Sequence, residues 1–202
     1  MTTLQTERLT LRPLVPDDTE AYAAMRFHPK VVKWLPPASG DPTGMGRSTI
    51  ERFAEGWQTR RYGPWGVFLE ERLIGHGGLN YVPEFAETEV LWALHPDAWG
   101  HGYATEVARA ALAYGFDTLG LDLIFAITLP DNRPSQAVMK RLGLTYRRRV
   151  EYKGFKDIVW FDMDRRTWAL SSFATLRMTE GPRSACSNPP GDPSPVHPKQ
   201  RR

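Results

Sequence analysis

The 202-residue chain has very little cysteine, no long apolar run and no net charge outside its C-terminal segment. Its single cysteine, Cys186, excludes an internal disulfide framework and a cysteine-based zinc site, and it favours a reducing, cytoplasmic compartment. No apolar stretch approaches the roughly 20 residues that a membrane helix needs, and residues 1–10 lack the apolar core of a signal peptide. We therefore expect no membrane partner and no metal.

The net charge of +3 comes from the end of the chain. Lysine plus arginine total 26 and aspartate plus glutamate total 23, while residues 171–202 contain five of the former and two of the latter. Residues 1–170 are therefore neutral, with 21 charges of each sign. No block of like charge supports a nucleic-acid partner, and Arg147–Arg149 fits a cluster on an edge strand.

Residues 171–202 also hold six of the 17 prolines and contain neither tryptophan nor tyrosine. Such a segment cannot bury enough apolar area to offset the entropy of ordering it, so we expect a disordered, proline-rich basic tail. The expected folded domain is residues 1–170, which is long enough for one substantial core.

Hydrophobic periodicity predicts a mixed α/β fold, because hairpins come first and a strand–helix–strand unit follows. The predicted strands are residues 7–14, 65–70, 73–82, 88–94, 123–129, 144–150 and 158–164. The predicted helices are residues 19–27, 48–62, 105–118 and 134–142. Residues 28–47 are rich in proline and glycine and predict a long loop, which in a compact domain is usually functional or mobile.

A glycine turn, Gly100-His-Gly102, joins the strand that ends at Leu94 to the helix that begins near Ala104. Backbone N–H groups of such a turn converge on one point, and the helix dipole adds positive potential there, so a pyrophosphate is a suitable ligand. The turn lacks the lysine of a P-loop and the third glycine of a dinucleotide fingerprint. Taken alone, it fits an anion site or a tight packing turn equally well.

The order of the segments around this turn resembles the GNAT superfamily of N-acetyltransferases. The resemblance extends over residues 5–168 and is carried by residues 89–106 and 132–144, while residues 6–13 resemble the RimJ/RimL-like branch, which acetylates the N-terminal alanine of ribosomal proteins. It implies a mixed, mostly antiparallel sheet of six to seven strands flanked by about four helices. It also implies acetyl-CoA as the acetyl donor.

The resemblance assigns a cofactor site residue by residue. Trp99 departs from the family turn, Gln/Arg-x-x-Gly-x-Gly/Ala, at its first position, although the backbone donors remain. Asn132 matches the residue that touches the pantetheine arm, and the end of the preceding strand pairs its backbone with the pantetheine amides. The implied contacts are Gly100, His101, Gly102, Tyr103, Ala104 and Thr105 for the pyrophosphate, and Trp92, Ala93, Leu94 and Asn132 for pantetheine.

Two residues are candidates for the chemistry. Glu89 matches a strand glutamate that acts as base in the branch, and the alternative is a polar residue on a solvated strand face. Many family members use a tyrosine to protonate the thiolate, but that position is Met139, so Ser135 becomes the candidate acid. Its alternative role is to cap the helix that follows. Because Cys186 lies in the tail, direct attack in a ternary complex is favoured over an acetyl-cysteine.

The acceptor is a primary amine, either a protein N-terminus or a small molecule. Trp34, His76 and Asn80 are candidate acceptor contacts, and His76 is alternatively a satisfied histidine of the sheet. Competing functions are an acetyltransferase for an antibiotic or polyamine, and an acyl-CoA sensor without turnover. The basic loop 28–47 weakly opposes a polycationic acceptor. Both a monomer and a homodimer fit the sequence.

Overall fold

The computed structural model describes residues 2–37 and 40–171, so the predicted tail, apart from Ser171, lies outside the described residues. A single eight-stranded sheet has the order β1-β2-β3-β4-β5-β6-β8-β7. The strands are β1 (Leu4–Gln5), β2 (Thr10–Arg12), β3 (Pro64–Leu69), β4 (Arg72–Val82), β5 (Glu87–Leu94), β6 (Leu123–Thr128), β7 (Thr145–Tyr152) and β8 (Phe155–Asp164). The α-helices are α1 (Thr19–Arg26), α2 (Pro29–Val32), α3 (Pro42–Arg60), α4 (Tyr103–Ala113) and α5 (Arg133–Arg141).

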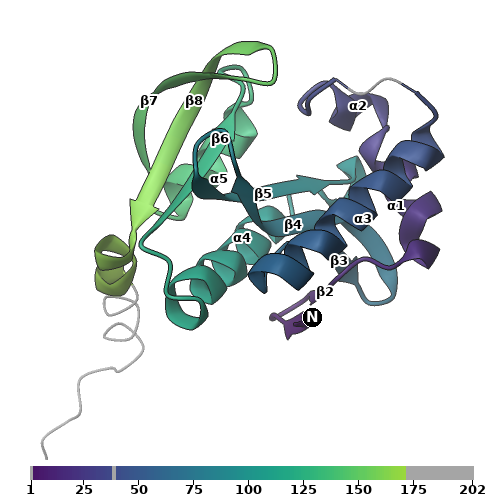
Figure 1. Cartoon of the computed structure of the whole chain (residues 1–202), viewed down its shortest axis with the longest axis horizontal. Helices are drawn as coiled ribbons and strands as arrows, with labels where there is room; N and C mark the ends of the chain where they lie inside the picture. The colour runs from purple at the N-terminus through teal and green to yellow at the C-terminus, as the bar shows by residue number, and fades with distance from the viewer. Residues whose placement is uncertain (1, 38–39, 172–202) are drawn as a thin grey trace, which may run out of the picture.

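The predicted mixed, mostly antiparallel sheet is confirmed, with slightly more strands and helices than expected. Strands β5 and β6 form the parallel pair, and their ladder has two registered positions, Thr88↔Ile124 and Glu89↔Phe125. Beyond these positions β5 continues to Leu94 and β6 to Thr128 without further pairing between them. The two strands therefore diverge toward their carboxyl ends, with β7 and β8 on one side of the molecule and α1–α3 on the other (Figure 1).

Apolar side chains on the two faces of β4 and β5 form separate cores. The larger core packs α4 against the sheet through residues such as Leu79, Val90 and Leu112. The smaller core lies under α1 and α3 and includes Tyr22 and Phe53. Alternate residues of one strand point to opposite faces, so side chains on β5 that do not face α4 face the α1–α3 layer.

The prediction of a loop over residues 28–47 was wrong in two places. Helix α2 forms within it, and α3 begins at Pro42 rather than Ser48. Asp41 caps α3, its Oδ2 accepting from the N–H of Gly44 at 2.6 Å, and a proline at the first helical position needs no hydrogen-bond partner for its nitrogen. Gly46 lies within α3 at the point where α1 crosses closely. A Cβ at this position would lie 3.2 Å from the Cβ of Ala23, which favours a glycine there.

Other boundaries also differ from the prediction. The expected strand over residues 7–14 is confined to Thr10–Arg12, because Thr6 and Leu9 close a turn in which the Thr6 N–H donates to the Leu9 carbonyl at 2.9 Å. The expected helix over 105–118 starts at Tyr103 and changes at Tyr114 into a π-helical turn that ends at Thr118. The expected arginine cluster on an edge strand is confirmed, since β7 is the last strand of the sheet.

The close crossing of α1 and α3 gives a stability prediction. Gly46→Leu forces side-chain atoms into the space filled by Ala23, so we expect the free energy of unfolding to fall by about 1–3 kcal/mol. Urea denaturation of the full chain measures this. Ser48→Leu, on the exposed side of α3, is the matched control and should change stability by less than about 0.5 kcal/mol. Equal losses in both variants would contradict the packing role of Gly46.

Candidate active site

A cavity of about 1660 Å³ opens where β5 and β6 diverge. Every candidate site residue predicted from the sequence lies on its wall. These residues are Trp34, His76, Asn80, Glu89, Trp92, Ala93, Leu94, Gly100, His101, Gly102, Tyr103, Ala104, Thr105, Asn132 and Ser135. Within residues 2–37 and 40–171, no group of histidine, cysteine, aspartate or glutamate side chains could hold a metal ion.

The glycine turn forms one end of this cavity. Gly100 and Gly102 both have left-handed φ angles, +81° and +82°, which L side chains rarely adopt. Gly102 is the N-cap of α4, and its carbonyl accepts from the N–H of Thr105 at 3.0 Å and of Glu106 at 3.1 Å. A Cβ at Gly100 would meet nothing within 4 Å, so the backbone is open to a ligand. The N–H of Thr105 already donates to the Gly102 carbonyl, so Thr105 contributes its side chain to the cavity wall.

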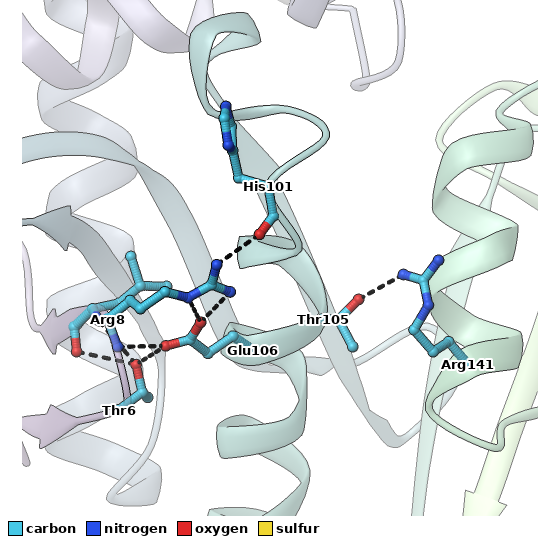
Figure 2. Close-up of polar contacts among 7 residues, drawn as sticks. Thr6, Arg8, His101, Thr105, Glu106 and Arg141 are labelled. Atoms are coloured by element: carbon cyan, nitrogen blue, oxygen red, sulfur yellow. Dashed lines mark hydrogen bonds and ion pairs between the residues drawn. The ribbon is translucent and has the colours of Figure 1, made fainter.

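Side chains distant in the sequence hold the turn in place. Arg8 donates from Nη1 to the His101 carbonyl at 2.9 Å and from Nε to Glu106 Oε2 at 2.8 Å, and Thr6 donates to Glu106 Oε1 at 2.6 Å. Figure 2 shows Thr6 and Arg8 converging on the Glu106 carboxylate. Burial raises the pKa of Glu106, but the hydrogen bonds from Thr6 and Arg8 outweigh it, so the pKa lies below its ordinary value. Glu106 therefore stays ionised as an anchor.

A second arginine reaches the turn from α5. Arg141 donates from Nη1 to Thr105 Oγ1 at 2.9 Å, and it approaches from the side opposite Arg8 (Figure 2). Neither arginine was predicted from the sequence, because their partners are 93 and 36 residues away in the chain. Arg8 lies within residues 6–13, which resemble one branch of the family, so that resemblance was the available signal for it.

Trp99 replaces the polar side chain of the family turn, and the structure shows what it does. Its indole Nε1 donates to the Leu94 carbonyl at 2.8 Å, which ties the turn to the end of β5. The ring is 43% exposed and lies on the cavity wall. The Leu94 carbonyl is therefore already hydrogen-bonded to Trp99 and is not free to pair with a ligand. Trp92 and Ala93 also lie on the cavity wall.

Helix α5 brings Asn132 and Ser135 to the cavity. Asn132 is the N-cap, its Oδ1 accepting from the backbone N–H of Ser135 at 3.3 Å. The alternative in which Ser135 caps this helix was therefore wrong, and Ser135 is a half-buried residue of the cavity wall. Met139 is 1% exposed and packs in the larger core.

Glu89 lies at the last registered pair of the β5–β6 ladder, where the strands separate. Desolvation raises the pKa of its carboxyl to about 8, although Lys153 and a hydrogen bond from the Asn80 side chain both oppose the rise. Asn80 is directly opposite Glu89 in the β4–β5 ladder. The alternative of a solvated strand residue is contradicted, because Glu89 is half-buried and lies on the cavity wall.

His76 is 6% exposed and packs against the rings of Tyr22 and Phe53, each with a centroid separation of 5.5 Å. Burial lowers its pKa to about 3, and the positive charges of Arg26 and Arg52 lower it further, so the imidazole is neutral at pH 7. Its Nδ1 is buried and has no hydrogen-bond partner in the described part of the chain. The alternative of a satisfied sheet histidine was therefore wrong. No pattern in the sequence predicts that Arg26 and Arg52 act on His76.

Comparison with known proteins identifies the family. A family model described as an acetyltransferase (GNAT) domain matches residues 8–145, which include the glycine turn, Glu89 and Ser135. The chain belongs to the GNAT acetyltransferase family. It is therefore an acyltransferase, and members of this family use acetyl-CoA as the acetyl donor.

Relatives of this GNAT protein support the assignment. An uncharacterized N-acetyltransferase of Bacillus subtilis, YoaA, is 29% identical over 143 residues, which cover 69% of this chain and 81% of YoaA. FsC-acetyl coenzyme A-N(2)-transacetylase of Aspergillus fumigatus is 31% identical over 155 residues, covering 71% of this chain and 65% of the relative. The crystal structure of an acetyltransferase from Agrobacterium tumefaciens is 30% identical with a TM-score of 0.70, covering 81% of this chain and 94% of that one.

One further finding concerns membranes. Among residues 2–37 and 40–171, no helix combines the length and apolar content that a membrane span requires.

The burial of Glu89 gives a pH-dependent stability prediction. A carboxyl whose folded pKa is raised favours folding most below its unfolded pKa of about 4.5, and that stability is lost as pH rises through about 8. Glu89→Gln cannot ionise, so its melting temperature relative to wild type should increase between pH 5 and pH 9. Glu87→Gln, two residues earlier on β5 and outside the cavity wall, is the control. A pH-independent difference for Glu89→Gln would contradict the burial of this carboxyl.

Proposed function

We propose that this chain transfers the acetyl group of acetyl-CoA to a primary amine by direct attack in a ternary complex. The observation that carries the proposal is the position of Glu89. Its carboxyl shares one cavity with the glycine turn and lies at the point where β5 and β6 separate. A cofactor site at the turn and a base of raised pKa along the same wall are what such a transfer requires.

The residues at the turn suit a ligand with several phosphates. The open space beside Gly100, the start of α4 and the guanidinium group of Arg141 supply the positive potential there, while Arg8 is paired with Glu106 and holds the turn. Acetyl-CoA, when bound, supplies the acetyl thioester. Backbone groups from Gly100 to Ala104 would hold its pyrophosphate, and Trp92, Ala93 and Asn132 would hold its pantetheine arm.

Glu89 acts as the general base. Its pKa of about 8 is close to the pKa of about 8 of an α-amine and well below the roughly 10.4 of a lysine side chain. Proton transfer to Glu89 from an α-ammonium is therefore nearly balanced, whereas transfer from a lysine ammonium is strongly uphill. Asn80 fixes the orientation of the carboxyl from the neighbouring strand. This match favours an α-amine or a similarly acidic amine as the acceptor.

Ser135 acts as the general acid toward the departing thiolate. It lies in the first turn of α5, and its backbone N–H is bound by Asn132, which fixes the position of the residue while its hydroxyl remains at the cavity. Met139, which stands where many family members have a tyrosine, is buried in the core and has no proton to donate.

The protein N-terminus is one acceptor that fits the pKa match and the resemblance of residues 6–13 to the ribosomal-protein branch. Within that segment, however, Thr6 and Arg8 support the turn through Glu106 and His101. The resemblance is thus explained by a contact that supports the cofactor end. It carries little information about the acceptor, which is determined by the other end of the cavity.

Replacement of Glu89 tests the base. Glu89→Gln should lower kcat by about 10²–10⁴-fold while changing acetyl-CoA affinity by less than about twofold, because the carboxyl contacts the acceptor and not the turn. Steady-state thiol release and titration calorimetry measure the two effects. Wild-type kcat/KM should rise through about pH 8, and the variant should keep only the titration of the free amine.

Two results bear on this test. Glu87→Gln, the control on the same strand, should have wild-type kinetics. Wild-type turnover in Glu89→Gln would contradict the role of Glu89, and failure of acetyl-CoA to bind at hundreds of micromolar would contradict the proposed function itself.

Ser135 is tested separately. Ser135→Ala should lower kcat by about 10-fold or more, because the thiolate then leaves without a proton donor. Ser135→Thr keeps the hydroxyl and should retain much of the rate. Since Asn132 caps α5 through a backbone N–H that every variant retains, the melting temperature should be unchanged in both. Equal rates in Ser135→Ala and wild type would exclude Ser135 as the acid.

A further inference from the structure

Two arginines on the cavity wall have no ion-pair partner in the described part of the chain. Arg26, at the end of α1, and Arg52, in α3, both lie on the cavity wall. In the described residues, neither has an aspartate or glutamate oxygen within 4.0 Å, whereas Arg8 and Arg12 form ion pairs of 2.7 and 2.8 Å. An arginine inside a cavity without an anion is an available binding group.

Arg26 is held in a fixed place but remains partly unsatisfied. Its Nη2 donates to the Pro36 carbonyl at 3.0 Å, while its Nη1 is buried and has no hydrogen-bond partner in the part of the chain that the structure describes. Leaving a buried donor of a charged group without an acceptor costs more than leaving a neutral one. A ligand oxygen placed at Nη1 would remove that cost.

His76 adds a second unsatisfied group beside the arginines. It is 94% buried on the cavity wall, its Nδ1 has no partner, and the charges of Arg26 and Arg52 both act on it. Burial, and the repulsion between a histidine cation and two guanidinium groups, keep the imidazole neutral, so it does not repel them. Arg26 and Arg52, from α1 and α3, thus act on one buried group of β4, and in the described residues no ion pair neutralises either arginine.

No acidic residue of the cavity wall forms an ion pair with these arginines in the described residues. Glu84, Glu89 and, with opposite sign, Arg52 all act electrostatically on Tyr152, and Lys153 is the cation that acts on Glu89. His76 and Asn80 are four residues apart on β4, so they share a face and lie roughly 13 Å apart along the strand. Because Asn80 is paired with Glu89, the base and His76 lie at different points along one face.

We infer that the acceptor is a primary amine that also carries a carboxylate, with the amine at Glu89 and the carboxylate bound by Arg26 and Arg52. This rests on the proposed function and adds the substrate class. A planar guanidinium donates two parallel hydrogen bonds to a carboxylate, and the neutral imidazole of His76 offers one more polar contact. The same arrangement disfavours polyamines, since a second ammonium would meet two guanidinium groups.

The test compares acceptors that differ only in charge. Thiol release is measured with linear glycine peptides from diglycine to pentaglycine, whose α-amine has a pKa of about 8, each paired with its own C-terminal carboxamide. Wild type should prefer the best acid over its carboxamide by at least about tenfold in kcat/KM, which is the scale of one hydrogen bond between charged groups. The chain length of the best acid reports the distance between Glu89 and the arginines.

Variants assign this preference to the two arginines. Arg26→Met and Arg52→Met keep the aliphatic stem, and each should reduce the preference to within about twofold, through a higher KM for the acid. Arg26→Lys should retain part of the preference. Arg47→Met, also in α3 but absent from the cavity wall, is the matched control and should keep it in full.

A binding measurement separates this inference from the proposed function. Calorimetry on the CoA-saturated protein should show the N-acetylated acid binding at least about tenfold more tightly than the N-acetylated carboxamide, and this difference should vanish in Arg26→Met. Discrimination in binding without thiol release would contradict the transferase proposal and support the carboxylate site. Turnover with equal use of acid and carboxamide, or preference retained in both methionine variants, would overturn the carboxylate site alone.

Discussion

The separation of β5 and β6 after Glu89 is the constraint on which the site depends. Two registered pairs hold these strands together, and both strands then continue without pairing to each other. A longer ladder would fill the space between them and remove the cavity. Because the fork falls at Glu89, its carboxyl is placed where backbone and helices surround it and bulk water is limited, which is what raises its pKa.

Long-range contacts then position both ends of that cavity. At the cofactor end, the turn depends on Arg8, which reaches His101 and Glu106 from the first residues of the sheet. At the acceptor end, α1 and α3 cross so closely that a Cβ at position 46 would lie 3.2 Å from the Cβ of Ala23, and each of these helices contributes an arginine, Arg26 and Arg52, to the cavity wall. Chemistry on β5 thus requires packing contributed by the first 60 residues.

Patterns within short segments of the sequence predicted those features of the fold that depend on interactions between residues close in the chain. The glycine turn, the helix after it, the strand that carries Glu89 and the hairpins follow from periodicity, turn residues and family resemblance. Helix α3 was placed too late, because Gly44 and Gly46 are typical of loops unless Asp41 caps the helix and Ala23 lies against it. The arginines of the cavity were missed for the same reason, since their roles depend on which elements meet in space.

Burial has opposite consequences for the two charged regions of the cavity. For Glu89, it makes the neutral acid the stable form and so gives a base whose strength matches an amine. A guanidinium cannot respond in that way, because it does not lose its proton at any ordinary pH. Arg26 therefore remains a cation with one buried donor that no described residue satisfies, and a carboxylate of the acceptor would offer that donor a partner. An acceptor that carries such a carboxylate would bind most favourably when its amine faces Glu89. The contact with the arginines would therefore both bind the acceptor and orient it.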